Sequence, residues 1–140
     1  WLPLKKEIIS LWKAFAPNVH ILFAYQNEKS MINDKCQMTN ILGGVLLVPS
    51  SNSAHYMYAF STKQGNKLST PSLLVWEAIK LAKRKGCKIF DLEGIYDDRY
   101  PQTKSWQGFT KFKEGFGGKE ITYPPTLVKY YNPLAKILNL

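Results

Sequence analysis

The chain has 140 residues, of which 45% are apolar and 14% aromatic, so it can bury a core and is not an intrinsically disordered chain. Its 19 Lys and Arg against 10 Asp and Glu give a net charge of +9, which favours anionic partners but is also what a generally basic, solvated surface produces. No segment approaches the roughly 20 apolar residues of a membrane span, and no signal peptide is visible. We therefore expect a cytoplasmic protein without a transmembrane segment, acting in the cytoplasm or at the inner face of the membrane.

The histidines and cysteines form no recognisable metal-binding or catalytic pattern. Cys36 and Cys87 match neither a CxxC pair nor a zinc-finger spacing, and His20 and His55 stand alone in the sequence. We therefore predict no metal site. No Ser-His-Asp or Cys-His arrangement emerges either, which argues against a hydrolase.

The first half of the chain predicts one helix followed by three strands. Apolar residues recur at helical spacing over residues 3–15, and compact apolar runs with β-branched and aromatic residues predict strands over 19–25, 40–48 and 54–61. The middle strand is nearly all apolar, so we expect it to be buried on both faces. Turn residues between the last two strands indicate an antiparallel pair.

Two adjacent glycines, Gly43 and Gly44, interrupt the middle strand. Such a pair indicates either a β-bulge or a position where another backbone or a ligand approaches closely. The sequence leaves both interpretations open.

The second half begins with a loop over residues 62–70 and then the best-defined helix. Thr70 fits the N-cap of this helix, Pro71 its first position, and Gly86 the residue that follows its C-cap. A strand over 88–92 comes directly afterwards. Because a helix connects this strand to the preceding one, we expect the two to pair in parallel.

The rest of the chain predicts a loop over 93–105, a short helix over 106–114, a last strand over 119–123 and a closing helix over 133–140. Strands therefore come first as an antiparallel meander, and parallel pairing begins after the long helix. This order predicts an α/β (α+β) fold with a mixed central sheet flanked by helices.

Two motifs in the second half resemble those of Fem-type aminoacyltransferases, which add amino acids to bacterial peptidoglycan precursors. Residues 73–94 read LLVWEAIKLAKRKGCKIFDLEG, similar to the family pattern LLxWExIxxAxxxGCxxxDxxG, and residues 112–118 read FKEGFGG, similar to FKxxFGG. The YYNP run over 130–133 also resembles the C-terminal tail of the family. The resemblance covers about residues 54–133 and, less closely, the first three strands.

The resemblance implies a GNAT-like acyltransferase fold. Residues 1–140 would form one GNAT-like domain, the C-terminal half of a longer two-domain protein, and a first residue of Trp1 rather than Met fits that expectation. It also implies transfer of an aminoacyl group from aminoacyl-tRNA to an amino group of a peptidoglycan precursor stem peptide, either UDP-linked (a UDP-muropeptide) or lipid-linked. No cofactor is implied. The N-terminal domain of the same protein would be a further partner.

Two other functions stay open. The first is a GNAT-type N-acyltransferase that uses acyl-CoA as its donor. The second is a non-catalytic basic module that binds RNA or an anionic wall polymer, for which steep salt dependence of binding is the expected mark.

Five residues of the FKEGFGG motif are candidates for the site. The resemblance places a functional lysine at Lys113, next to Phe112, where its ammonium would stabilise the oxyanion of acyl transfer or hold the terminus of the donor tRNA. A solvated lysine on a short helix is the plain alternative, and Phe112 fits core packing as well as substrate stacking. Gly115, Gly117 and Gly118 either present N–H groups to the acyl donor or simply turn the chain.

Asp91 and Glu93 alternate where the parallel strand enters its loop, so we expect both side chains on one face. Two carboxylates so placed are candidates for binding the substrate or for a general base. A structural role for Asp91 is the alternative.

The loop over 62–70 carries Lys63 and Lys67, which are candidates for contacts with donor phosphates or are simply solvated. GNAT enzymes that use acetyl-CoA have a Q/RxxGxG/A loop here, whose N–H groups hold the pyrophosphate. This chain has Gln64 and Gly65 but no second glycine at that spacing. The departure argues against CoA and favours an aminoacyl-tRNA donor.

Overall fold

The computed structural model describes residues 5–26, 40–125 and 129. The chain divides into two compact units, Trp1–Ile95 and Tyr96–Leu140, which are called unit 1 and unit 2 and are described separately. No helix in the described ranges combines the length and the apolar character needed to cross a membrane.

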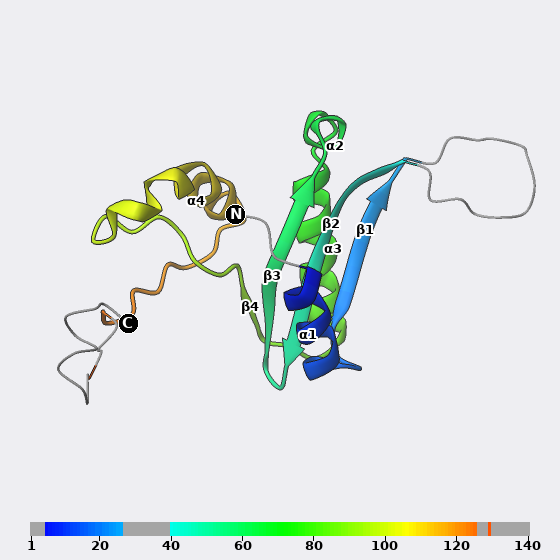
Figure 1. Ribbon diagram of the computed structural model, residues 1–140, viewed down its shortest axis with the longest axis horizontal. Helices are drawn as coiled ribbons and strands as arrows, with labels where there is room; N and C mark the ends of the chain where they lie inside the picture. Colours follow the sequence, from blue (N-terminus) through cyan, green and yellow to red (C-terminus); the bar gives the residue numbers. More distant parts are fainter. Residues whose placement is uncertain (1–4, 27–39, 126–128, 130–140) are drawn as a thin grey trace, which may run out of the picture. The chain divides into compact units, whose positions relative to one another are not determined.

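Unit 1 is built on a four-stranded mixed sheet. The strands are β1 (His20–Tyr25), β2 (Ile41–Ser50), β3 (Ser53–Ser61) and β4 (Ile89–Asp91), in the order β1-β2-β3-β4 (Figure 1). The first three pair antiparallel, and β4 pairs in parallel with β3. The predicted meander and the switch to parallel pairing are therefore confirmed.

The predicted burial of the middle strand on both faces is also confirmed, because residues 42–48 of β2 are all buried. Helix α3 (Thr70–Arg84) lies behind the sheet in Figure 1 and α1 (Lys5–Phe15) lies in front of it. On the α3 side, Leu47 packs with Leu74 and Ala78. On the α1 side, Leu46 and Val48 pack with partly buried residues of α1. Alternate residues of one strand thus serve two cores, each closed by one helix.

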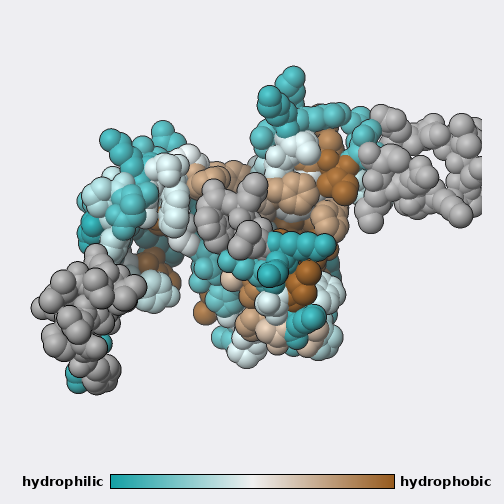
Figure 2. All heavy atoms as spheres, in the orientation of Figure 1, coloured by the Kyte–Doolittle hydropathy of each residue, from teal (hydrophilic) through white to brown (hydrophobic). Residues whose placement is uncertain are grey.

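The glycine pair in β2 permits close approach. A Cβ atom added to Gly43 would lie 2.8 Å from the carbonyl oxygen of Phe60, and one added to Gly44 would lie 2.7 Å from the Phe60 ring and 2.9 Å from the Phe23 ring. The bulge falls beside the pair, at Leu42, because Ala24 pairs with Gly43 and Tyr25 with Ile41. The Phe23 and Phe60 rings meet edge to face at 6.5 Å and stay half exposed, and hydrophobic side chains are visible on this side of unit 1 (Figure 2).

Two details before α3 differ from the sequence prediction. The expected loop contains a short helix, α2 (Lys63–Lys67), capped by the Thr62 hydroxyl, which accepts the N–H of Gly65. Sequence reasoning missed this helix because five residues are too few to show helical periodicity. The N-cap of α3 is Ser69, in the left-handed conformation at φ 56°, rather than Thr70. Thr70 is the first helical residue and is buried, with its methyl group close to Gly43.

Unit 2 contains a 3₁₀ helix (Pro101–Trp106) that leads directly into α4 (Gln107–Glu114). The predicted short helix over 106–114 is thus confirmed. The predicted strand over 119–123 is wrong, because these residues form no ladder with another strand and both Ile121 and Tyr123 are exposed. The predicted closing helix over 133–140 lies outside the described residues.

A substitution of Gly65 would show how tightly α2 packs against the sheet. A Cβ atom at this buried position would overlap the backbone carbonyl of Leu42 in β2, which cannot yield as a flexible side chain can. We therefore expect Gly65→Ala to lower the free energy of unfolding by about 1–3 kcal/mol, as overpacking does, measured by urea denaturation. Gly108→Ala is the matched control, since nothing lies within 4 Å of an added Cβ there. Equal stability of the two variants would contradict the packing role of Gly65.

Candidate functional site

A cluster of ionisable side chains marks the end of the parallel pairing between β3 and β4. The two strands pair over three positions only, Ser53 with Ile89, Ala54 with Phe90 and His55 with Asp91. Strand β3 continues to Ser61, whereas β4 ends at Asp91. Ala54 and Phe90 face the α3 core, so by strand alternation His55 and Asp91 face the other side of the sheet.

Three side chains converge there, and we call them the His55–Asp91–Glu93 cluster. His55 Nδ1 lies 3.1 Å from Glu93 Oε1 and 3.8 Å from Asp91 Oδ2. Asp91 Oδ1 also accepts the backbone N–H of Glu93 at 2.7 Å. The side chains of His55, Asp91 and Glu93 are 34%, 43% and 40% exposed, so the cluster is open to molecules in solution.

The backbone of Glu93 is in an unfavourable conformation. Its φ is 63°, in the left-handed region that a residue with a side chain occupies at a cost of about 1–2 kcal/mol. This backbone turn accompanies the hydrogen bond from its N–H to Asp91. Residues with strained backbones cluster at functional sites, which makes Glu93 a candidate functional residue.

The expectation that Asp91 and Glu93 share one face is met, since both approach the same imidazole. Sequence reasoning missed the third member, because His55 stands 36 positions or more from the two carboxylates and matches no metal-ligand spacing. Only the register of a parallel pair, which places His55 beside Asp91, brings the three together.

Ser53 extends the cluster along β3. Its hydroxyl oxygen lies 3.0 Å from His55 Nε2 and 3.4 Å from the carbonyl oxygen of Ser50. The two residues are two positions apart and therefore on the same side of the strand, so the contact follows from alternation. Ser53, His55 and Glu93 form a line of hydrogen bonds that the sequence alone does not reveal.

The loop before α3 does not form a phosphate cradle from its glycine. The N–H of Gly65 donates to the Thr62 hydroxyl at 3.0 Å, and its α-carbon packs against β2. Lys63 and Lys67, predicted to contact the donor, are exposed on α2. Gly65 therefore serves packing and capping, which agrees with the missing second glycine.

In unit 2, the FKEGFGG motif forms the end of α4 and the turn after it. Phe112 and Phe116 are half buried and pack edge to face with ring centres 5.3 Å apart. Lys113 lies in the last turn of α4 and is half buried. The motif thus places its lysine between two residues whose side chains are held by packing.

The glycines of the motif end the helix. The N–H of Gly115 donates to Lys111 and that of Gly117 to Glu114, so both donors are engaged within the chain. Gly117 has a φ of 72°, which other residues rarely adopt. These contacts support the chain-turning role for Gly115 and Gly117. Contact between an acyl donor and Gly118 stays a prediction.

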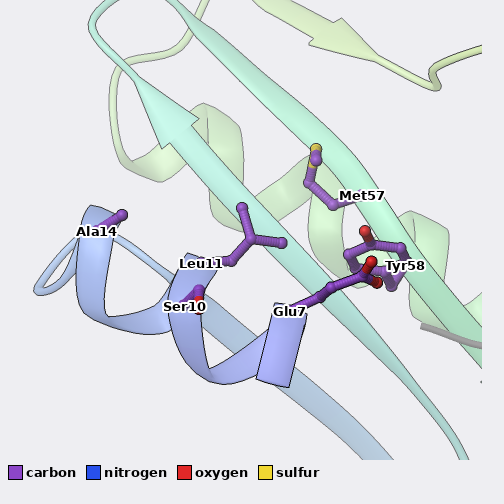
Figure 3. Close-up of a pocket in the computed structure, with 6 residues that line it drawn as sticks. All are labelled: Glu7, Ser10, Leu11, Ala14, Met57 and Tyr58. Atoms are coloured by element: carbon purple, nitrogen blue, oxygen red, sulfur yellow. The ribbon is translucent and has the colours of Figure 1, made fainter. Parts of the chain in front are cut away.

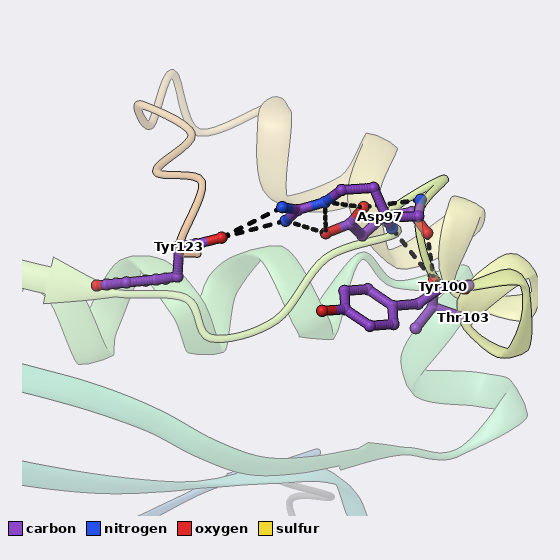
Figure 4. Close-up of polar contacts among 5 residues, drawn as sticks. Asp97, Tyr100, Thr103 and Tyr123 are labelled. Atoms are coloured by element: carbon purple, nitrogen blue, oxygen red, sulfur yellow. Dashed lines mark hydrogen bonds and ion pairs between the residues drawn. The ribbon is translucent and has the colours of Figure 1, made fainter. Parts of the chain in front are cut away.

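A polar network holds the segment that leads into α4. Arg99 donates to both carboxylate oxygens of Asp97 and to the carbonyl oxygen of Tyr123 (Figure 4). The Arg99 guanidinium lowers the pKa of Asp97, so the pair stays charged around neutral pH. Thr103 accepts the N–H of Asp97 at 3.2 Å. The side chain of Arg99 thereby ties the start of unit 2 to the residues after the motif.

A separate open hollow of about 410 Å³ lies between α1 and β3 in unit 1. Glu7, Ser10 and Leu11 line it from α1, and Met57 and Tyr58 line it from β3 (Figure 3). Its walls include no residue of the His55–Asp91–Glu93 cluster. We therefore place the chemistry of unit 1 at the cluster, where ionisable groups converge, rather than in the hollow.

The fold is a GNAT-like α/β fold, shared with known acyltransferases. The chain is similar to the aminoglycoside antibiotic 6'-N-acetyltransferase AAC(6')-Ih from Acinetobacter baumannii, with a TM-score of 0.63 and 12% identity over 94% of this chain and 85% of that chain. It is also similar to the aminoglycoside N-acetyltransferase AAC(6')-Iy, solved in complex with CoA, with a TM-score of 0.57 and 12% identity over 89% and 87% of the two chains. A transcriptional regulator from Bacillus halodurans C-125 matches as well, with a TM-score of 0.56, 19% identity and 91% and 78% coverage. At such identities the likeness establishes the fold alone.

The sequence comparison identifies the protein family, which the fold alone does not. Residues 20–140 match the model of the FemAB family. The chain therefore belongs to the FemAB family, as the motifs at residues 73–94 and 112–118 predicted. A comparison with curated protein sequences finds no match.

The conformation of Glu93 leads to a prediction that separates strain from side-chain function. Glu93→Gly and Glu93→Ala both remove the carboxylate, but only glycine adopts a φ near 63° without steric cost. We expect the glycine variant to have a free energy of unfolding about 1 kcal/mol higher than the alanine variant, measured by thermal or urea denaturation. If alanine proved as stable as glycine here, Glu93 would not be strained.

Proposed function

We propose that this chain carries the catalytic part of a Fem-type aminoacyltransferase. The reaction moves an aminoacyl group from aminoacyl-tRNA to an amino group of a peptidoglycan precursor stem peptide, either UDP-linked or lipid-linked. The observation that supports this most is the match of residues 20–140 to the FemAB family. The GNAT-like fold supports acyl transfer to an amine as the class of reaction.

In this proposal Lys113 acts on the donor carbonyl. Attack on the ester develops negative charge on the carbonyl oxygen, and a positioned ammonium stabilises it. Lys113 suits this role because it is half buried and lies at the end of a helix whose flanking phenylalanines pack together. A lysine held in this way loses less freedom when it meets the donor than one on a fully exposed turn.

Asp91 and Glu93 are the residues of unit 1 that we propose to bind the acceptor amine. The attacking amine arrives as an ammonium ion and must lose a proton before it can attack. Two carboxylates whose oxygens both point at His55 form a local negative site on a protein with a net charge of +9. Such a site attracts the ammonium and is able to accept its proton.

Acyl-CoA is less well supported as the donor. Acetyl-CoA-dependent GNAT enzymes bind the pyrophosphate with N–H groups of a glycine-containing loop. Here the N–H of Gly65 is engaged by Thr62, and its α-carbon is packed against β2. Lys63 and Lys67 on α2 remain candidates for contacts with the phosphates of the tRNA terminus. We place the reaction in the cytoplasm, where both substrates of this proposal are found.

The proposal is tested with labelled donors offered in parallel to the protein. The donors are aminoacyl-tRNA and acetyl-CoA, and the acceptor is a UDP-muropeptide. We expect label to pass from tRNA, and Lys113→Ala to lower kcat/KM by about 100-fold, the usual cost of losing one oxyanion-stabilising group. Lys111→Ala on the exposed side of α4 is the matched control and should leave the rate close to that of the unchanged protein.

Lys113→Arg and thermal unfolding of each variant separate loss of the ammonium from loss of structure. Label passing only from acetyl-CoA would favour the acyl-CoA N-acyltransferase. Transfer from neither donor, combined with salt-dependent binding of RNA or wall polymer, would favour the non-catalytic module.

A further inference from the structure

We propose that His55, Asp91 and Glu93 form a binding site for one divalent transition-metal ion of the zinc type. The ligands are His55 Nδ1 and one oxygen of each carboxylate. Neither the family nor the fold supplies this assignment, which comes from the side chains that the β3–β4 register places together. The binding does not depend on the proposed function.

The spacing of the donor atoms fits an ion between them. One ligand atom from each residue lies within 4.8 Å of the other two. Ligand atoms bound tetrahedrally at about 2.0–2.2 Å from a zinc ion lie about 3.3–3.6 Å from one another. His55 Nδ1 is already 3.1 Å from Glu93 Oε1 and 3.8 Å from Asp91 Oδ2. Small side-chain rotations are enough to complete the site.

The hydrogen bonds around His55 are compatible with a metal ion at Nδ1. The Ser53 hydroxyl lies 3.0 Å from His55 Nε2 and 3.4 Å from the carbonyl oxygen of Ser50. When this hydroxyl donates to Ser50, it accepts a hydrogen bond from the Nε2–H of His55, and the lone pair of the ring is then on Nδ1, facing the two carboxylates. A metal ion bound between them would accept this lone pair. Metal coordination uses all three groups at once.

Partners outside the cluster orient the ligands, as in protein metal sites. Ser53 binds the ring nitrogen that does not face the carboxylates, and the N–H of Glu93 binds Asp91 Oδ1, which leaves Oδ2 directed toward His55. In the described part of the chain, the ion pairs of Asp91 and Glu93 involve His55 and no Lys or Arg. One imidazole nitrogen and two carboxylate oxygens are a donor set suited to zinc and its neighbours. The half-exposed side chains leave the remaining positions to water.

The test is a Co²⁺ titration of the chelator-treated protein, followed by its visible absorption, with Zn²⁺ as competitor. We expect one equivalent to bind. His55→Ala and Glu93→Gln should each weaken binding about tenfold or more, because each removes one of three ligands. His20→Ala is the matched control. The pKa of His20 is lowered by burial and by the nearby Lys85 charge, which also disfavours a cation there, so this variant should bind as the unchanged protein does.

Thermal unfolding without metal shows whether each variant is folded. Glu93→Gln keeps the size of the side chain, so it is expected to fold. If His55→Ala is unfolded, the effect of Glu93→Gln on Co²⁺ binding decides the test. Absence of saturable binding, or binding that neither variant weakens, would overturn the proposal. A thiolate-to-cobalt absorption band that disappears in Cys87→Ser would overturn it as well, because the ion would then be bound at a cysteine.

Discussion

The short parallel pairing of β3 and β4 is the constraint on which the rest of unit 1 depends. Helix α3 ends at Arg84, and Gly86, just after its C-cap, has a φ of 84° that reverses the chain. The N–H groups of Lys88 and Ile89 then donate to one carbonyl oxygen, that of Asn52, at 2.8 and 3.1 Å. Because Asn52 lies in the turn just before β3, these bonds fix which residue of β4 meets which residue of β3. The pairing of Asp91 with His55 follows directly.

This register places negative charge locally on a positive protein. At a net charge of +9 the protein attracts anions from a distance. At contact distance the nearest groups dominate, because solvent and salt screen the more remote charges. Asp91 and Glu93 therefore form a local negative site within a basic protein, which is the basis of both proposals for a cation there.

The packing of α2 is a local feature that the GNAT-like fold does not by itself determine. The same architecture occurs in acetyltransferases and in a protein described as a transcriptional regulator. Fold likeness therefore leaves the donor open, and the decision lies in local chemistry. In this chain Gly65 is committed to the sheet and to its Thr62 cap, so its N–H is not directed at a ligand.

Sequence reasoning succeeded where periodicity and local stop signals are strong. The apolar stripe of α3, the fully apolar β2 and the turn at Gly86 determine their own structures, because burial and backbone sterics act within a few residues. The family was also recognisable, since its two motifs are contiguous in the chain. The predicted strand over 119–123 failed because alternation in sequence does not provide a strand partner. The five-residue helix α2 was missed because it is held by a cap and by one close contact with β2.

The sequence by itself thus determined α1, α3, α4, the strands of the mixed sheet and the FemAB motifs. Only the tertiary structure decided that His55 joins Asp91 and Glu93, that Gly65 packs against β2, and that Gly115 and Gly117 use their N–H groups to end α4. The physical reason is that these contacts depend on strand register and on close approach between elements. Register and approach are set by hydrogen bonds between distant segments, such as those to the Asn52 carbonyl, which no local pattern records.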